Sequence, residues 1–151
     1  MMHAFSPFSS AAISVAKKHG ILAIRCPKEK RGKLQHLAII QQLKSLLLSQ
    51  SSSRLRNLAE QFGITTPDTF IGIADTGKMT AARYRNIFDS TGCGVKEIMT
   101  HPGYFDKHEH HDFPAGFLKN TREVELKGLI EPGLKEYGKS QDLTFIHFGE
   151  L

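Results

Sequence analysis

The sequence has few of the features that mark disulfide-rich, membrane-spanning or nucleotide-binding proteins. It contains only two cysteines, Cys26 and Cys93, and no CxxC pair, so we expect neither a disulfide framework nor a zinc ribbon. No stretch reaches the roughly 18 apolar residues that a membrane span needs. There is also no glycine-rich phosphate loop and no GxSxG nucleophile motif. These absences favour a protein of a reducing compartment, and we expect the cytoplasm.

Acidic residues are scarce near the amino terminus, and the whole chain is basic. No Asp or Glu precedes Glu29, and the formal net charge is +5. The densest basic cluster comprises Lys28, Lys30, Arg31 and Lys33. Such a cluster can bind nucleic acid, but a solvated loop is the simpler interpretation. We therefore do not expect nucleic acid as the main partner.

Short apolar runs alternate with segments of helical periodicity along the chain. Contiguous, β-branched apolar residues predict buried strands, and apolar residues every three or four positions predict helices. The predicted strands are 21–26, 69–74, 95–100 and 143–148, with a turn at residues 75–77. The predicted helices are 7–19, 34–48, 55–63 after an interruption at the Ser-rich stretch 49–53, 79–90, 123–130 and 132–138.

The alternation of strands and helices determines the expected fold class. Continuous apolar strands that alternate with helices are typical of a parallel sheet covered by helices. About four strands are fewer than a closed barrel requires. We therefore predict an α/β fold, with a partial (β/α) barrel-like arrangement in a single domain, residues 1–151.

Two of the predicted strands deliver residues that could act on a ligand. In parallel sheets, ligands bind outside the carboxyl ends of the strands. Arg25 lies at one such end, where it could hold an oxyanion or carboxylate by two parallel hydrogen bonds, or remain a surface residue. His101 lies at another, followed by Pro102 and Gly103. It could act as a general acid or base, bind a metal, or cap a loop.

The segment after His101 is rich in histidine and acidic residues. The sequence KHEHHD at residues 107–112 resembles a metal-binding pattern, but HxH spacing in a loop is equally typical of an exposed polar segment. We therefore assign no metal ligand to it. Glu123 and Glu125 begin the next predicted helix, where helix-end electrostatics and surface charge are the simplest explanation.

Three segments, taken in order, resemble the YdjC/ChbG-like carbohydrate deacetylases. They are HAFSPFSSAAISVAKKHGILAIRCPKE at 3–29, TFIGIADTGKMT at 69–80, and EIMTHPGYFD at 97–106 followed by NTREVEL at 120–126. The last segment is similar to the family's strand that ends in HPG and its helix with an Arg-x-x-Glu-Leu pattern. The resemblance implies a barrel-like fold and a divalent metal, magnesium or zinc. It also implies hydrolysis of an N-acetyl group on a sugar, with release of acetate.

The resemblance also implies roles for individual residues. His101 matches the histidine of the HPG motif and is the candidate catalytic residue. Arg25 matches a strand-end arginine that shapes the pocket. His3 matches the last histidine of the family's D-S-H-x-H-x-H motif. We take Arg25 and His3 as candidate substrate-binding residues.

The sequence departs from the family pattern upstream. The family's Asn-Ala-Asp-Asp-Phe-Gly motif, which supplies catalytic and metal-binding aspartates, does not occur in the chain. The histidine of the D-S-H element would fall before Met1. We therefore expect the chain to correspond to the carboxyl-terminal half of a family member, to lack most metal ligands, and to be inactive alone.

Two other functions remain open. The chain could be a non-catalytic module that pairs with itself or with a missing amino-terminal half, because open sheet edges favour association. It could also bind nucleic acid through residues 28–33. For the deacetylase hypothesis the partner is an N-acetylated sugar or oligosaccharide.

Overall fold

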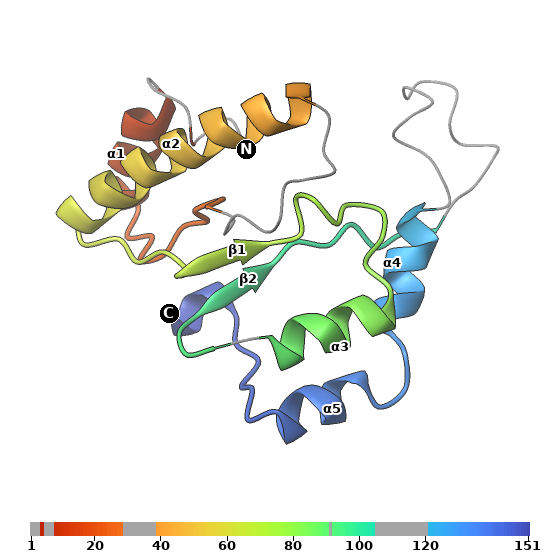
Figure 1. Ribbon diagram of the computed structural model, residues 1–151. Helices are drawn as coiled ribbons and strands as arrows, with labels where there is room; N and C mark the ends of the chain where they lie inside the picture. The colour runs from red at the N-terminus through yellow and green to blue at the C-terminus, as the bar shows by residue number, and fades with distance from the viewer. Residues whose placement is uncertain (1–3, 5–7, 29–38, 91, 105–120) are drawn as a thin grey trace. The chain divides into compact units, whose positions relative to one another are not determined.

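The computed structural model describes residue 4 and residues 8–28, 39–90, 92–104 and 121–151, with the backbone alone for 39–49. These residues form two compact units. Unit 1 contains the chain up to residue 71 with 94–98 and 146–151, and unit 2 contains 72–93 and 99–145. The elements in Figure 1 are α1 (Phe8–Lys18), α2 (Ile39–Gln61), β1 (Thr69–Ile71), α3 (Ala81–Asp89), β2 (Lys96–Ile98), α4 (Thr121–Leu129), α5 (Leu134–Ser140) and a 3-10 helix (Phe148–Glu150).

Unit 1 has a small hydrophobic core between α1 and α2. Ile13 and Ala16 of α1 pack with Leu55 and Ala59 of α2, and all four side chains are buried. Burial of a side chain such as Ile13 or Leu55 contributes roughly 1.5–3 kcal/mol. The helix predicted at the amino terminus is confirmed with nearly the same bounds.

The Ser-rich stretch 49–53 does not interrupt a helix, so that prediction is wrong. Helix α2 runs through it without a break. Ser52 is fully buried, its hydroxyl donates to the carbonyl oxygen of Pro27 at 3.1 Å, and Cys26 Sγ donates to the Ser52 carbonyl oxygen at 3.3 Å. A small side chain is needed where the helix approaches this segment, and tertiary packing overrides the weak helix propensity of serine.

Strands β1 and β2 form a parallel pair in unit 1 and lie side by side in Figure 1. They confirm two predicted strands, although each is only three residues long. The pairing register is Thr69 with Lys96, Phe70 with Glu97 and Ile71 with Ile98.

In unit 2, Gly72 has φ +117°, and a Cβ on it would lie 2.7 Å from the Met99 carbonyl oxygen.

The strand predicted at 21–26 is wrong, because it shrinks to one bridge. Ala23 pairs in parallel with Thr65, and the backbone hydrogen bonds there join Ile24 N–H and the Leu22 carbonyl to Thr65. Pro67 follows two residues later on the partner segment. Proline lacks a backbone N–H, so the ladder cannot continue through it.

The strand predicted at 143–148 is also wrong. Among the described residues it has no partner strand, and its end forms the 3-10 helix instead. In unit 2, the Phe145 ring packs edge-on against Phe88 of α3, with centroids 5.8 Å apart. One apolar side chain of this run, Phe145, therefore packs on a helix, while Ile146 and Phe148 are 45% and 39% exposed. The described part shows helices with a small two-stranded parallel sheet, and the partial barrel and the single domain stay predictions.

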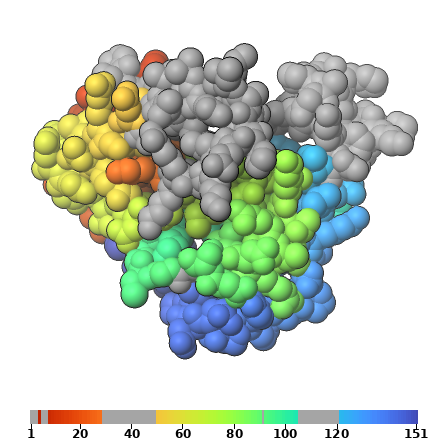
Figure 2. Space-filling view, in the orientation of Figure 1, coloured from red at the N-terminus to blue at the C-terminus, as the bar shows by residue number. Residues whose placement is uncertain are grey.

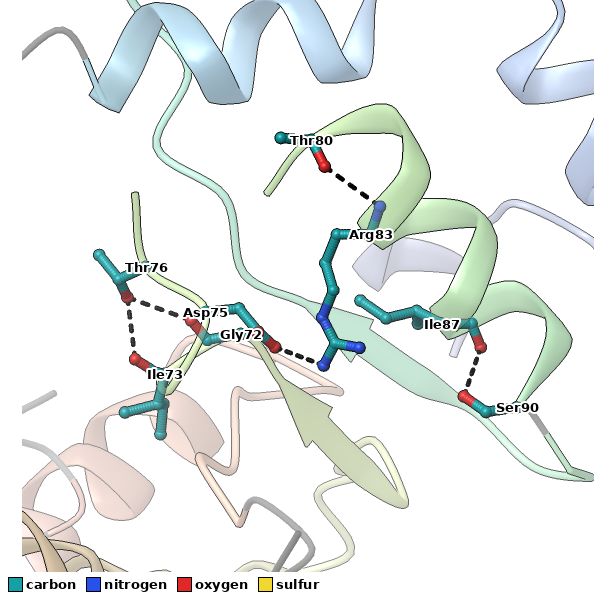
Figure 3. Close-up of polar contacts among 8 residues, drawn as sticks. All are labelled: Gly72, Ile73, Asp75, Thr76, Thr80, Arg83, Ile87 and Ser90. Carbon is teal, nitrogen blue, oxygen red and sulfur yellow. Dashed lines mark hydrogen bonds and ion pairs between the residues drawn. The ribbon is translucent and has the colours of Figure 1, made fainter. Parts of the chain in front are cut away.

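Helix α3 organises unit 2 by packing against α4 and α5. Its amino terminus is capped by Thr80, whose hydroxyl oxygen accepts from Arg83 N–H at 3.3 Å (Figure 3). Helix α4 approaches it closely, since a Cβ on Gly128 would lie 2.5 Å from the Met79 carbonyl oxygen. In Figure 2 the blue surface of α5 lies directly beside the green surface of α3. The helices predicted at 79–90, 123–130 and 132–138 are confirmed with shifted ends.

Candidate active site

The centre of the candidate site is Glu125, a buried carboxylate of α4 in unit 2. Its side chain is only 1% exposed. Oε1 accepts a hydrogen bond from the backbone N–H of Gly77, and Oε2 accepts one from the backbone N–H of His101. A buried carboxylate is costly unless its oxygens are satisfied. These two bonds therefore link segments that lie far apart in the sequence.

The turn that precedes Gly77 is held by its own side chains, as Figure 3 shows. The hydroxyl oxygen of Thr76 lies 3.1 Å from the carbonyl oxygens of both Gly72 and Ile73. The Asp75 carboxylate forms an ion pair with Arg83 of α3 at 2.7 Å. The turn is thus fixed by the Thr76 contacts at its start and by the ion pair with α3. It presents the backbone N–H of Gly77 to the Glu125 carboxylate of α4.

Glycine is required at position 77 for two reasons. Its φ is +80°, a backbone conformation that side chains with a Cβ rarely adopt. A Cβ at Gly77 would also lie 3.0 Å from Cβ of Thr121, the first residue of α4. The turn predicted at 75–77 is confirmed, and its close contact with α4 explains how the N–H of Gly77 reaches Glu125.

His101 lies three residues after the end of β2. Its Nδ1 atom is buried, has no hydrogen-bond partner among the described residues and lies 3.7 Å from Glu125 Oε2, while the side chain as a whole is 38% exposed. The accessible surface of the ring therefore belongs to its other atoms. Nearby, Gly103 N–H donates to the Arg122 carbonyl oxygen at 3.3 Å, which ties the HPG segment to α4 a second time.

Tyr84 of α3 is buried close to the same carboxylate. Burial raises the pKa of its hydroxyl to about 12, the charge of Glu125 adds to the rise, and a contact with the Thr100 side chain opposes it. The Tyr84 oxygen has no partner with good hydrogen-bond geometry among the described residues. The hydroxyl thus stays neutral beside the carboxylate at physiological pH.

Sequence comparison identifies the family. The family model described as YdjC-like protein matches residues 1–140. The chain belongs to the YdjC-like family. The searches of the curated proteins and of the solved structures found no match to this chain. The family is associated with carbohydrate deacetylase-like proteins, so the resemblance found from the HPG and Arg-x-x-Glu-Leu segments is confirmed at family level.

Arg25 of this YdjC-like protein lies in unit 1, where it is paired with Glu97 of β2. Its Nε and Nη2 atoms both lie 2.5 Å from Glu97 Oε1, and its guanidinium stacks 5.4 Å from the centre of the Phe70 ring. The Arg25 side chain is 43% exposed, whereas that of Glu97 is 9% exposed. The charge of Arg25 is therefore already matched in part, and a substrate-binding role stays a prediction.

The described residues of the YdjC-like protein do not fit a divalent metal. They contain no group of three or more His, Cys, Asp or Glu side chains placed to hold an ion. At the His101 site, both oxygens of Glu125 already accept backbone N–H groups. His3 and residues 107–112 lie outside the described residues, as does most of the basic segment 28–33. No helix in the described part is long and apolar enough to cross a lipid bilayer.

The sequence reasoning missed Glu125, which it assigned to helix-end or surface charge. One signal could have found it. Thr121, Glu125 and Gly128 are spaced i, i+4 and i+7, so they share one face of a helix. A glycine on a helix face marks close packing, and here both Thr121 and Gly128 lie against the backbone or side chains of other segments. A carboxylate on that same face must be buried too.

Proposed function

We propose that this YdjC-like protein takes part in hydrolysis of an N-acetyl group on a sugar or oligosaccharide, with His101 as the residue that transfers protons. The supporting observation is the His101 ring, which has Nδ1 buried against Glu125 and its other side accessible. A histidine held in this way can present Nε2 to a bound substrate. Membership of a family associated with carbohydrate deacetylase-like proteins supports a carbohydrate as the substrate class.

The proposed reaction is amide hydrolysis. Water adds to the acetyl carbonyl carbon, the carbon–nitrogen bond breaks, and the products are acetate and the free amino sugar. The leaving amine needs a proton, since expulsion of an unprotonated amide nitrogen is unfavourable. His101 Nε2 takes up a proton and passes it to that nitrogen, a role that typically contributes about 10²–10⁴-fold to the rate.

Metal dependence belongs to this proposal through the family resemblance. We assign no metal step to the described residues, because their donor groups do not fit an ion. The Asn-Ala-Asp-Asp-Phe-Gly motif does not occur in the 151 residues. We therefore expect the isolated chain to release no appreciable acetate, and we keep His3 and Arg25 as candidate substrate-binding residues.

The first test is the mass of the natural product, measured by immunoblot of the source cells against this chain. If the band lies near twice 16.9 kDa, the longer protein is assayed. If it lies near 16.9 kDa, this chain is assayed together with any co-purifying partner. The assay measures acetate release from N-acetylated chitooligosaccharides with added magnesium or zinc. Absence of acetate release from the natural product under all these conditions would refute the proposal.

The residue test compares two histidine variants of that natural product. We expect His101→Ala to lower turnover by roughly 10²-fold or more without changing the thermal unfolding midpoint. His19→Ala is the matched control, because His19 is an exposed histidine at the end of α1 and should leave the rate unchanged. A His101→Ala variant that retains its rate would make His101 a loop cap.

A second candidate function, self-association or binding of a partner chain, has one supporting observation. Ile21 and Leu22 are 47% and 71% exposed, and they lie next to the single bridge at Ala23. Exposed apolar residues beside extended backbone with a single bridge favour pairing with another chain. Size-exclusion chromatography of the wild-type chain and of Leu22→Lys tests self-association, and a monomer in both cases would refute self-association.

A further inference from the structure

We propose that Glu125 is a positioning residue that fixes the protonation pattern of the His101 ring, with the proton on Nδ1 and the free electron pair on Nε2. Its catalytic meaning rests on the proposed function. The arrangement of the two side chains does not, because it follows from the contacts within unit 2 alone.

The chemistry of the carboxylate selects the tautomer. An ionised carboxylate is only an acceptor and has no proton to donate. An imidazole nitrogen that faces it is favourable only when that nitrogen carries a hydrogen. The Nδ1 atom of His101 is buried, and Oε2 of Glu125 lies 3.7 Å from it, longer than a hydrogen bond, with no other hydrogen-bond partner for Nδ1 among the described residues. Such contacts are often long without substrate and shorten when a substrate binds.

The carboxylate is held still by the backbone. Oε1 is bound to Gly77 N–H, in a turn that is itself anchored through Arg83 and Asp75. Oε2 is bound to the backbone N–H of His101, the same residue whose ring it faces. Rotation of Glu125 would break both bonds and leave buried polar groups unsatisfied, which is costly. The carboxylate is therefore fixed beside the His101 ring by the backbone of two segments.

The consequence is that only Nε2 can exchange a proton with a substrate. In the neutral ring Nε2 accepts a proton, and in the charged ring it donates one, while Nδ1–H remains directed at Glu125 in both states. A neutral histidine that is free in water favours the other tautomer, with its hydrogen on Nε2. The predicted tautomer of His101 can therefore be tested in the wild-type protein, without a variant.

The experiment is nitrogen NMR of the histidine rings in the uniformly labelled full chain, above the pH at which His101 becomes neutral. His101→Gln identifies the His101 signals by their loss. We expect a pyrrole-type Nδ1 and a pyridine-type Nε2 for His101. A pyridine-type Nδ1 in the folded wild-type chain would overturn the proposal.

Variants separate positioning from simple stabilisation. Glu125→Gln has one acceptor oxygen in place of two, so it cannot serve both backbone N–H groups and Nδ1–H, and we expect the Nε2–H tautomer to gain population. Glu123→Gln, on the same helix with a side chain 32% exposed, removes the same charge and should keep the wild-type pattern. A Glu125→Gln spectrum identical to wild type would overturn the proposal.

An activity readout links the tautomer to turnover. In a natural product that releases acetate, Glu125→Gln should lower kcat by about tenfold or more with KM nearly unchanged. An unchanged kcat would make Glu125 purely structural. If the wild-type product releases no acetate but shows the Nδ1–H tautomer, the proposed function fails while the placement of His101 by Glu125 stands.

Discussion

Glu97 and Glu125 are both largely buried carboxylates, but they are satisfied in different ways. Glu97, in unit 1, faces the guanidinium of Arg25, which is partly exposed to solvent. Glu125, in unit 2, is held by two backbone N–H groups, and the ring of His101 lies beside it. A side-chain pair can be removed as a unit, whereas backbone donors remain after any substitution. The comparison therefore predicts that unit 2 depends on its carboxylate far more than unit 1 does.

The largest effect should come from Glu125→Ala. The substitution leaves the N–H groups of Gly77 and His101 buried without an acceptor, and each such group costs about 1–3 kcal/mol. We expect a loss of roughly 3 kcal/mol or more in the free energy of unfolding, measured with urea. Glu123→Ala, two residues earlier on the same helix, should change it by about 1 kcal/mol or less, because the Glu123 side chain is 32% exposed and pairs with Lys127 at 3.9 Å. Equal effects of the two variants would contradict the central role of Glu125.

A second effect concerns alkaline pH. The pKa of Tyr84 is raised to about 12 from an ordinary 10.0, chiefly by burial and then by Glu125. The folded state thus holds this proton more tightly than the unfolded state. The corresponding stability is complete below pH 10 and is lost as the pH rises through 12, by an amount on the order of 2–3 kcal/mol.

Urea unfolding of the wild type and of Tyr84→Phe across this pH range checks the alkaline effect. The Phe variant has no hydroxyl to ionise, so its stability should fall less steeply. Tyr104→Phe is the control, because Tyr104 is 84% exposed. A parallel fall in the free energy of unfolding of Tyr84→Phe and the wild type would contradict a buried Tyr84 hydroxyl close to the charge of Glu125.

A third variant tests whether α4 must approach α3 closely for Glu125 to reach its donors. In Gly128→Ala the new Cβ would lie 2.5 Å from the Met79 carbonyl oxygen and 3.0 Å from Ala81 N, both backbone atoms. We expect a loss of about 1–3 kcal/mol from overpacking, measured by urea unfolding. Gly92→Ala, whose Cβ would meet no atom within 4 Å, should be nearly neutral. A neutral Gly128→Ala would show that α4 can shift freely.

The smallest effect should come from the ion pair of unit 1. Solvent screens the partly exposed Arg25, but Glu97 is only 9% exposed, so we expect Arg25→Gln to cost about 1–2 kcal/mol. A double-mutant cycle with Glu97→Gln, repeated at high salt, measures the coupling and its screening. A coupling energy as large as the effect of Glu125→Ala would remove the contrast between the two carboxylates.

The sequence predicted the features that depend on local pattern. The helix at α1, the turn at 75–77 and the two central strands were found from periodicity, β-branching and glycine. The family was found from three short segments, at 3–29, 69–80 and 97–126, and the match over residues 1–140 confirms it. Each of these depends on residues close together in the chain, which a single sequence records directly.

The features that the sequence did not predict depend on contacts between distant segments. The burial of Glu125 requires Gly77 and His101 to meet it, and nothing local to α4 specifies either partner. Ser52 continues a helix because it lies against Pro27, although a serine-rich stretch favours a break by propensity. The run at 21–26 has strand character, yet Pro67 on its partner segment limits the ladder to one bridge.

The fully buried Cys26 has a consequence for chemical labelling. Burial raises the pKa of its thiol, although Arg56 and Lys28 oppose the shift, and the thiolate is the form that reacts. Cys93 is exposed. The chain thus carries one shielded sulfur and one accessible sulfur. We expect an alkylating reagent to modify the exposed Cys93 faster than Cys26, which becomes accessible only when its surroundings open. The ratio of the two products therefore reports how often unit 1 opens locally.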